Sequence, residues 1–148
     1  MRIYYAGALF SLAEKRFNRE LADALGERLG DAEFVLPQER ASQFLDREDW
    51  SERMFEDCLA MIDASDAVLA ILDGPDADSG TSLELGYAYA RGVPVVGVRT
   101  DFRGGEDRGL NLMLSNVCRT LVLEPVDALT TLADRIGPAL EAVRPPRG

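Results

Sequence analysis

Acidic side chains gather in one short stretch of this chain. Asp73, Asp76, Asp78 and Glu84 follow an apolar run, residues 67–72, that has the composition of a fully buried strand. The Asp- and Gly-rich segment after this run is expected to be a loop, with Glu84 in the first turn of the next helix. Ligands of open α/β sheets bind at the carboxyl ends of the strands. The stretch therefore predicts a small-molecule site whose carboxylates perform chemistry or bind an ion.

Glu84 has two interpretations. Residues 81–84, Thr-Ser-Leu-Glu, match a capping box, in which the Glu folds back onto the N–H of the cap residue. The surroundings favour a functional role, with Asp78 six residues earlier, Gly80 for close backbone approach, and Tyr87 one turn on. A carboxylate beside a helix N-terminus is kept ionised by the helix dipole, and an ionised, positioned carboxylate is what a nucleophile requires.

The other acids and the first strand carry further expectations. Asp73 and Asp76 are interpreted as turn residues that satisfy loop N–H groups, and no continuation of a calcium-binding EF-hand follows them. Tyr4 and Tyr5 alternate along a strand, so they are expected to face opposite sides of the sheet. Either is by default a core residue with a satisfied hydroxyl. Tyr4 is also expected to end near Glu84 at the switch point of the sheet, where its hydroxyl would orient the carboxylate.

Composition narrows the class of protein. The chain has 148 residues, of which 47% are hydrophobic, and residues 1–143 are expected to form one domain. The net charge of −10 argues against nucleic acid or an anionic membrane as a partner. The sequence predicts neither a membrane span nor a signal peptide, hence a cytoplasmic location. Cys58 and Cys118 are interpreted as buried free thiols, with a reactive cysteine as the alternative.

The chain contains no histidine. This absence excludes Ser-His-Asp and Cys-His catalysis and any His-ligated metal site. Protons near neutral pH must then be moved by carboxylates, tyrosines or Lys15, the single lysine. We expect neither a metal nor a cofactor.

Apolar runs alternate with helical patterns along the whole chain. Strands are predicted at residues 3–6, 33–36, 67–72, 95–98 and 120–123. Helices are predicted at residues 12–29, 50–63, 80–91 and 126–143, with one helical turn at 111–115. Residues 38–49 and 100–109 are interpreted as loops and 144–148 as a frayed tail. In the second helix, Phe55, Leu59 and Ile62 are expected to face inward.

This alternation predicts an α/β fold. Right-handed β-helix-β crossovers give a single-domain, doubly wound, five-stranded parallel sheet with helices on both faces. The flavodoxin-like order 2-1-3-4-5 is the first choice, and it places the switch point between strands one and three.

Four segments together resemble the nucleoside 2-deoxyribosyltransferase family. They are IYYAGALFS at residues 3–11, VLPQE at 35–39, DADSGTSLELGYAYARGVPVVGVRTDFR at 76–103 and NLM at 111–113. The specific part is an Asp, then Gly-Thr, then a helix reading Glu-hydrophobic-Gly-Tyr-Ala. The resemblance implies that Glu84 is the nucleophile, that Asp78 contacts the base or sugar, and that Tyr4 holds the nucleophile.

The resemblance also implies the substrate-binding residues and an assembly. Gln38 would contact the nucleobase, and Gly80 would allow close approach. Asn111 and Met113 would be supplied by a neighbouring subunit, which implies a homo-oligomer, from dimer to hexamer, with shared active sites.

Two departures from the family pattern stand out. Many members have an Asp where this chain has Cys58, and Asp57 is the adjacent candidate for the missing carboxylate. A one-residue shift turns a helical side chain by about 100°. The tail RPPRG at residues 144–148 also lacks the aromatic C-terminus of some members.

The chemistry that fits is a retaining double displacement at the anomeric carbon of a 2′-deoxynucleoside. Glu84 would attack C1′ while Asp78 or a neighbour protonates the departing base, and the sugar would pass to another nucleobase. One alternative is an N-glycosidase acting on 2′-deoxynucleosides or their 5′-monophosphates; the apolar loop at residues 7–11, with Ser11 its polar exception, favours a nucleoside. Another alternative is a non-catalytic nucleotide-sensing module of the same fold.

Overall fold

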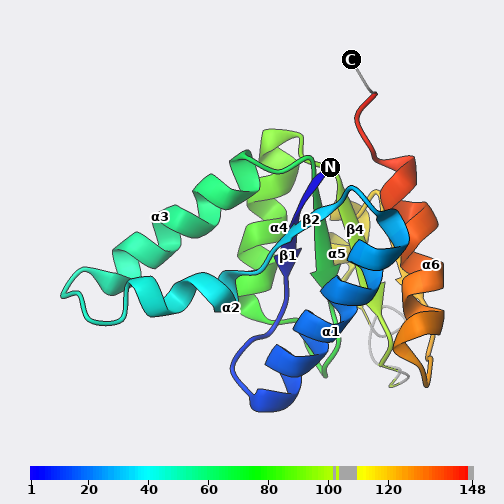
Figure 1. The fold of residues 1–148 in the computed structure, drawn as a ribbon, viewed down its shortest axis with the longest axis horizontal. Coiled ribbons are helices and arrows are strands. Elements are labelled where there is room, and N and C mark those ends of the chain that lie inside the picture. The colour runs from blue at the N-terminus through cyan, green and yellow to red at the C-terminus, as the bar shows by residue number, and fades with distance from the viewer. Residues whose placement is uncertain (102, 104–109, 147–148) are drawn as a thin grey trace.

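The computed structural model describes residues 1–101, 103 and 110–146. Five parallel strands form one sheet of order β2-β1-β3-β4-β5, which confirms the predicted α/β fold (Figure 1). The strands are β1 (Arg2–Ala6), β2 (Glu33–Val35), β3 (Ala67–Ile71), β4 (Val95–Arg99) and β5 (Thr120–Leu123). The helices are α1 (Leu12–Leu29), α2 (Pro37–Arg40), the 3-10 turn η1 (Ala41–Gln43), α3 (Trp50–Asp63), α4 (Ser79–Arg91), α5 (Leu112–Val117) and α6 (Leu129–Ala142).

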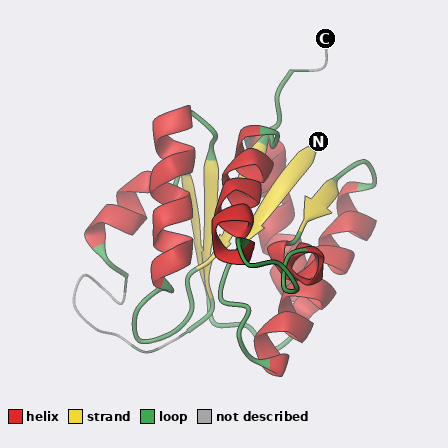
Figure 2. Ribbon diagram, turned by 90° about the vertical axis from the view of Figure 1, so that its left-hand side faces the viewer, coloured by secondary structure: helices red, strands yellow, loops and turns green. Residues whose placement is uncertain are grey.

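Helices cover both faces of the sheet (Figure 2). Two buried clusters result, one on each face, and side chains that alternate along a strand enter them in turn. Tyr5 and Ile3 pack with α1 and α6, whereas Tyr4 packs with Ile62 of α3 and Leu85 of α4. The two tyrosines therefore face opposite sides of the sheet, as their spacing predicts.

The switch point lies between β1 and β3. Ala6 is level with Ala70, and Tyr4 is level with Val68 on one side and Val35 on the other. The chain leaves β1 toward one edge and β3 toward the other, so their carboxyl ends open side by side. This is the place where doubly wound sheets bind ligands.

Two sequence expectations for the region before and within α3 are wrong. Residues 38–49 are not a loop throughout, because Pro37 opens the helix α2 and η1 follows it. Proline suits the first helical position, since its fixed φ is helical and its missing N–H would have no partner there. Phe55 does not face inward but is 52% exposed. Figure 1 shows the first half of α3 projecting beyond the sheet.

The C-terminal part departs from expectation in smaller ways. The closing helix begins at Leu129, three residues later than expected, after the loop that follows β5. Arg144 is held rather than frayed, since its guanidinium pairs with Asp31 and Glu141. Residues 147–148 and most of the predicted loop at 100–109 lie outside the described residues. Within the described part of the chain, no helix is long and apolar enough to cross a membrane.

Candidate active site

Tyr4 and Glu84 meet on the α3 and α4 side of the sheet. The Tyr4 hydroxyl donates a hydrogen bond of 2.6 Å to Glu84 Oε1. Tyr4 is fully buried in β1, so its ring is fixed by packing and its hydroxyl has a set direction. The sequence predicted this proximity from the order of the strands; the catalytic roles of the two residues remain predictions.

The capping box at residues 81–84 is wrong, and so is the placing of Glu84 in the first turn. Helix α4 begins at Ser79, and its cap is Asp78, whose Oδ2 accepts hydrogen bonds from Thr81 N at 2.8 Å and Thr81 Oγ1 at 3.1 Å. Because an Asp is itself a strong cap, the helix starts earlier than the Thr-Ser pair suggests. Glu84 therefore lies in the second turn, with its side chain free to reach Tyr4.

The environment of Glu84 opposes its ionisation. Burial raises the pKa of Glu84 to about 7, with a further rise from the negative charge of Asp78 and a partial offset from the Tyr4 hydrogen bond. The expectation that the helix N-terminus keeps Glu84 ionised is thus wrong, since the dipole acts mainly within the first turn. Burial and the neighbouring Glu84 charge raise the pKa of Tyr4 far above its ordinary value, so Tyr4 stays a donor.

Glu84 opens onto a cavity of about 210 Å³. The walls are largely apolar and come from the exposed half of α3 and the start of α4; they include Trp50, Met54, Phe55, Cys58, Gly80 and Leu83. Phe55 is among the residues that line this cavity. An apolar wall beside a carboxylate suits a flat, weakly polar ring such as a nucleobase.

A second cleft, of about 320 Å³, lies toward α1. Asp78 and Asp73 line it together with Asn18, Phe17 and Thr100. Asp78 is therefore shared between this cleft and the surroundings of Glu84. A Cβ at Gly80 would lie 3.1 Å from Asp78 Oδ2, so a side chain there would crowd the cap of α4. The role of Gly80 in substrate binding remains a prediction.

Gln38 sits at the start of α2 with its amide tied to α1. Its Nε2 donates to the Lys15 carbonyl at 2.9 Å, and its Oε1 accepts from Asn18 Nδ2 at 3.1 Å. Asn18 is buried and also donates to the Ala8 carbonyl at 3.0 Å, so it joins the β1–α1 loop to Gln38. The sequence reasoning missed Asn18; the signal was an amide on the apolar stripe of α1.

Asp57 and Cys58 differ in where they point. Asp57 forms a two-pronged ion pair with Arg40, with distances of 2.6 Å and 2.7 Å. Cys58 instead lines the cavity beside Glu84 and interacts with the Tyr4 hydroxyl. Burial raises the pKa of the Cys58 thiol, so this cysteine is a neutral neighbour of the pair.

Asn111 and Met113 lie at the start of α5. Asn111 is the helix cap, and its Oδ1 accepts from Met113 N at 2.9 Å. The Met113 side chain is 68% exposed and that of Leu112 is 54% exposed, which leaves an apolar surface at this end of the domain.

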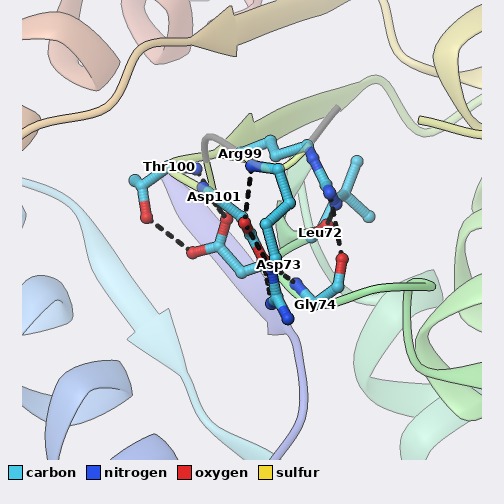
Figure 3. Close-up of polar contacts among 7 residues, drawn as sticks. Leu72, Asp73, Gly74, Arg99, Thr100 and Asp101 are labelled. Atoms are coloured by element: carbon cyan, nitrogen blue, oxygen red, sulfur yellow. Dashed lines mark hydrogen bonds and ion pairs between the residues drawn. The ribbon is translucent and has the colours of Figure 1, made fainter. Parts of the chain in front are cut away.

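Asp73 satisfies loop N–H groups, as expected. It accepts hydrogen bonds from the backbone N–H groups of Thr100 and Asp101 and from the Thr100 hydroxyl. Arg99, which the sequence reasoning missed, reaches into the same region from the end of β4 (Figure 3). Its signal was a lone cation directly after the apolar run at residues 95–98.

Among the described residues, no group of three or more acidic or thiol side chains is arranged to hold a metal ion.

Comparison with known proteins identifies a family for this chain. Residues 3–114 match the family described as nucleoside 2-deoxyribosyltransferase. The chain belongs to this family. No curated protein matches the sequence significantly.

Solved structures share the fold over almost the whole chain. A conserved protein from Enterococcus faecalis is 28% identical, with a TM-score of 0.72, and the match covers 94% of this chain and 98% of that one. A 2-deoxyribosyltransferase from Bacillus psychrosaccharolyticus is 22% identical, with a TM-score of 0.69 and coverage of 90% and 91%. A CMP N-glycosidase from Clostridium botulinum is 16% identical, with a TM-score of 0.58 and coverage of 95% and 99%. Family membership supports an enzyme that transfers a glycosyl group or cleaves an N-glycosidic bond.

Proposed function

We propose that the protein transfers 2-deoxyribose from one nucleobase to another through a covalent intermediate on Glu84. The observation that carries this proposal is the half-buried Glu84 carboxylate, held by the Tyr4 hydroxyl at 2.6 Å and open to an apolar cavity. A positioned carboxylate at the carboxyl edge of the sheet can reach an anomeric carbon without a metal or a histidine.

In the first step, a Glu84 oxygen forms a bond to C1′ as the bond from C1′ to the base nitrogen breaks. The electron pair of that bond leaves with the base, which takes up a proton. Tyr4 fixes the orientation of the carboxylate through this hydrogen bond. The absent 2′-hydroxyl eases this step, since it would withdraw electrons from the developing oxocarbenium ion.

Asp78 is proposed to meet the substrate beside Glu84. Its Oδ2 caps α4, so its Oδ1 is the oxygen that would contact the departing base as an acid or a sugar hydroxyl as an acceptor. In the second step a nitrogen of the incoming base attacks C1′ from the face that the first base left and gives its proton to the group that protonated the first base, as the bond from C1′ to Glu84 breaks. Two inversions give net retention.

The charges around the site support a nucleoside rather than a 5′-nucleotide. Glu84 and Asp78 make the surroundings acidic, which disfavours a phosphate. Two arginines of the described part of the chain are engaged in ion pairs: Arg40 with Asp57, and Arg103 with Asp101. Deoxynucleosides and free nucleobases are thus the proposed substrates, with Gln38 contacting the base.

We also propose that the site is shared between subunits. The exposed apolar surface at Leu112 and Met113 is suited to contact a second copy of the chain. Asn111 and Met113 would then contribute to the active site of that second copy. The expected assembly is a homo-oligomer.

Base exchange tests the proposal directly. The protein is incubated with a deoxynucleoside and a different free base, and the new nucleoside is sought by chromatography. We expect exchange by the wild type, no exchange by Glu84→Gln, and undiminished exchange by Glu20→Gln, a matched change on the exposed face of α1. Release of free deoxyribose without exchange would instead indicate the N-glycosidase, and ligand binding without either product would indicate a sensing module.

A further inference from the structure

Arg99 is the last residue of β4, and its side chain is only 5% exposed. Side chains alternate along the strand, with Val95 in the cluster that contains Tyr4 and Val96 and Val98 in the opposite one. Arg99 therefore points to the face of the sheet that carries Glu84. A buried cation at a ligand-binding edge is costly unless its donors are used.

The guanidinium binds the backbone just where β3 ends. Its Nη1 donates to the Leu72 carbonyl at 2.5 Å, and its Nη2 donates to the Gly74 carbonyl at 2.9 Å (Figure 3). These carbonyls lie past the last paired residue of β3 and would otherwise need other partners. One planar side chain thus sets the direction in which the chain leaves the sheet.

The carboxylates of Asp73 and Asp101 add further hydrogen bonds between the ends of β3 and β4. Asp73 accepts from Thr100 N at 2.6 Å and from Asp101 N at 2.9 Å, and Asp101 accepts from Gly74 N at 3.1 Å. Residues 72–74 and 99–101 are therefore joined by hydrogen bonds in both directions. We call this set, Leu72, Asp73, Gly74, Arg99, Thr100 and Asp101, the strand-end clamp.

The clamp is close to the proposed catalytic groups along the chain. Only residues 75–77 separate it from Asp78, which caps α4. Gly74 has φ of +117°, a conformation that side chains other than glycine rarely adopt, so the path of this short loop is set at its first residue. A shift at Gly74 would move Asp78 and the start of α4, and with them Glu84.

We infer that Arg99 is a positioning residue for the Glu84 site, acting through the strand-end clamp to place Asp78 and the first turns of α4. This inference rests on the proposed function for its kinetic consequences. The charged and titratable groups that face Glu84 are Tyr4 from β1, Cys58 from α3 and Asp78 at the cap of α4. Of these, the loop carries Asp78 alone, so loosening the clamp should weaken the influence of Asp78 on Glu84.

The test compares Arg99→Met and Arg99→Lys with the wild type. The control is Arg91→Met, which removes an exposed arginine that ends α4 and pairs with Asp63. For Arg99→Met we expect kcat to fall roughly 10- to 100-fold, as for misplacement of catalytic groups by about 1 Å, with KM changed by less than about threefold. Arg99→Lys should recover part of kcat, because one ammonium group can bind one carbonyl. Added guanidinium should restore part of the activity of Arg99→Met, and the control should behave as the wild type.

A second readout does not depend on turnover. The Glu84 carboxyl is titrated by carbon NMR, with Glu84 assigned by its loss in Glu84→Gln. In Arg99→Met the pKa of Glu84 should fall, because the charge of Asp78 that raises it has moved away. If the wild type shows no exchange or hydrolysis, the proposed function fails, while the NMR titration still tests the clamp.

Stability measurements separate positioning from folding. If Arg99→Met does not fold, the double variant Thr100→Val, Asp101→Asn loosens the same clamp without removing the buried cation, and it should show the same loss of kcat and the same fall in the pKa of Glu84. A folded Arg99→Met with wild-type kcat, KM and Glu84 titration would overturn the inference and leave Arg99 a structural residue only.

Discussion

Removal of the Tyr4 hydroxyl is the perturbation whose effect the structure predicts most fully. Tyr4→Phe keeps the buried ring and deletes the 2.6 Å hydrogen bond to Glu84 Oε1. That bond favours the ionised form of Glu84, against burial and the charge of Asp78. Its loss must therefore raise the pKa of Glu84.

The size of the shift follows from the energy of the bond. A hydrogen bond to a charged group contributes about 1.5–3 kcal/mol, which corresponds to about one to two pKa units. Starting from a pKa of about 7, the ionised fraction at pH 7 would fall from about one half to about one tenth or one hundredth. If the carboxylate is the nucleophile, kcat/KM at pH 7 should drop roughly 5- to 50-fold.

The assay is the pH profile of kcat/KM for base exchange by the wild type and Tyr4→Phe. We expect the acid limb of the variant to move to higher pH and most of the activity to return above about pH 9. Tyr5→Phe is the matched control, since Tyr5 lies on the opposite face of the sheet. An acid limb that stays in place, or a loss of activity that is uniform across pH, would refute the assigned role of Tyr4.

Three further changes have outcomes that follow from contacts in the structure. Glu84→Gln should stabilise the protein at high pH. The contribution of Glu84 to stability is fully present below its unfolded pKa near 4.5 and is lost as pH rises through about 7. In urea unfolding, the free energy of unfolding of the variant should exceed that of the wild type by an amount that grows from pH 5 to pH 9, to about 3 kcal/mol. Asp78→Ala should lose about 1 kcal/mol of stability because the helix cap is removed, whereas Asp78→Asn should keep the cap and its stability. Both changes should lower the pKa of Glu84, since both remove the charge of Asp78. Equal stabilities of the two variants would contradict the capping role. Gly97→Ala should destabilise by about 1–3 kcal/mol in denaturant unfolding, since its Cβ would lie 2.6 Å from Cys118 Sγ and 2.7 Å from Leu121 Cδ2; wild-type stability would show that the sheet yields there.

Much of the fold was predictable because local patterns and packing agree. The bounds of α1, α3 and β5 coincide with those predicted from periodicity, since their apolar patterns begin and end clearly. The short helix α2 was not predicted because residues 38–49 have no apolar period. Phe55 was misplaced because periodicity shows which residues share a face of a helix but not where the helix extends past its neighbours.

The site was predictable in its members more than in its electrostatics. Strand order and alternation bring Tyr4 to Glu84, and both can be read from the sequence. The pKa of Glu84 depends on burial, which arises from packing among distant segments and has no local signal. Arg99 was missed for the same reason, since its partners are backbone carbonyls, which every residue carries.

Trapping the intermediate tests the central claim most directly. The protein is mixed with a deoxynucleoside without acceptor base, quenched in acid within the first turnover, and examined by intact-mass and peptide mass spectrometry. We expect a mass increase of one deoxyribosyl group on the peptide that contains Glu84, and none in Glu84→Gln. Turnover of the wild type with the adduct on another residue, or with inversion at C1′ and no adduct, would contradict the account.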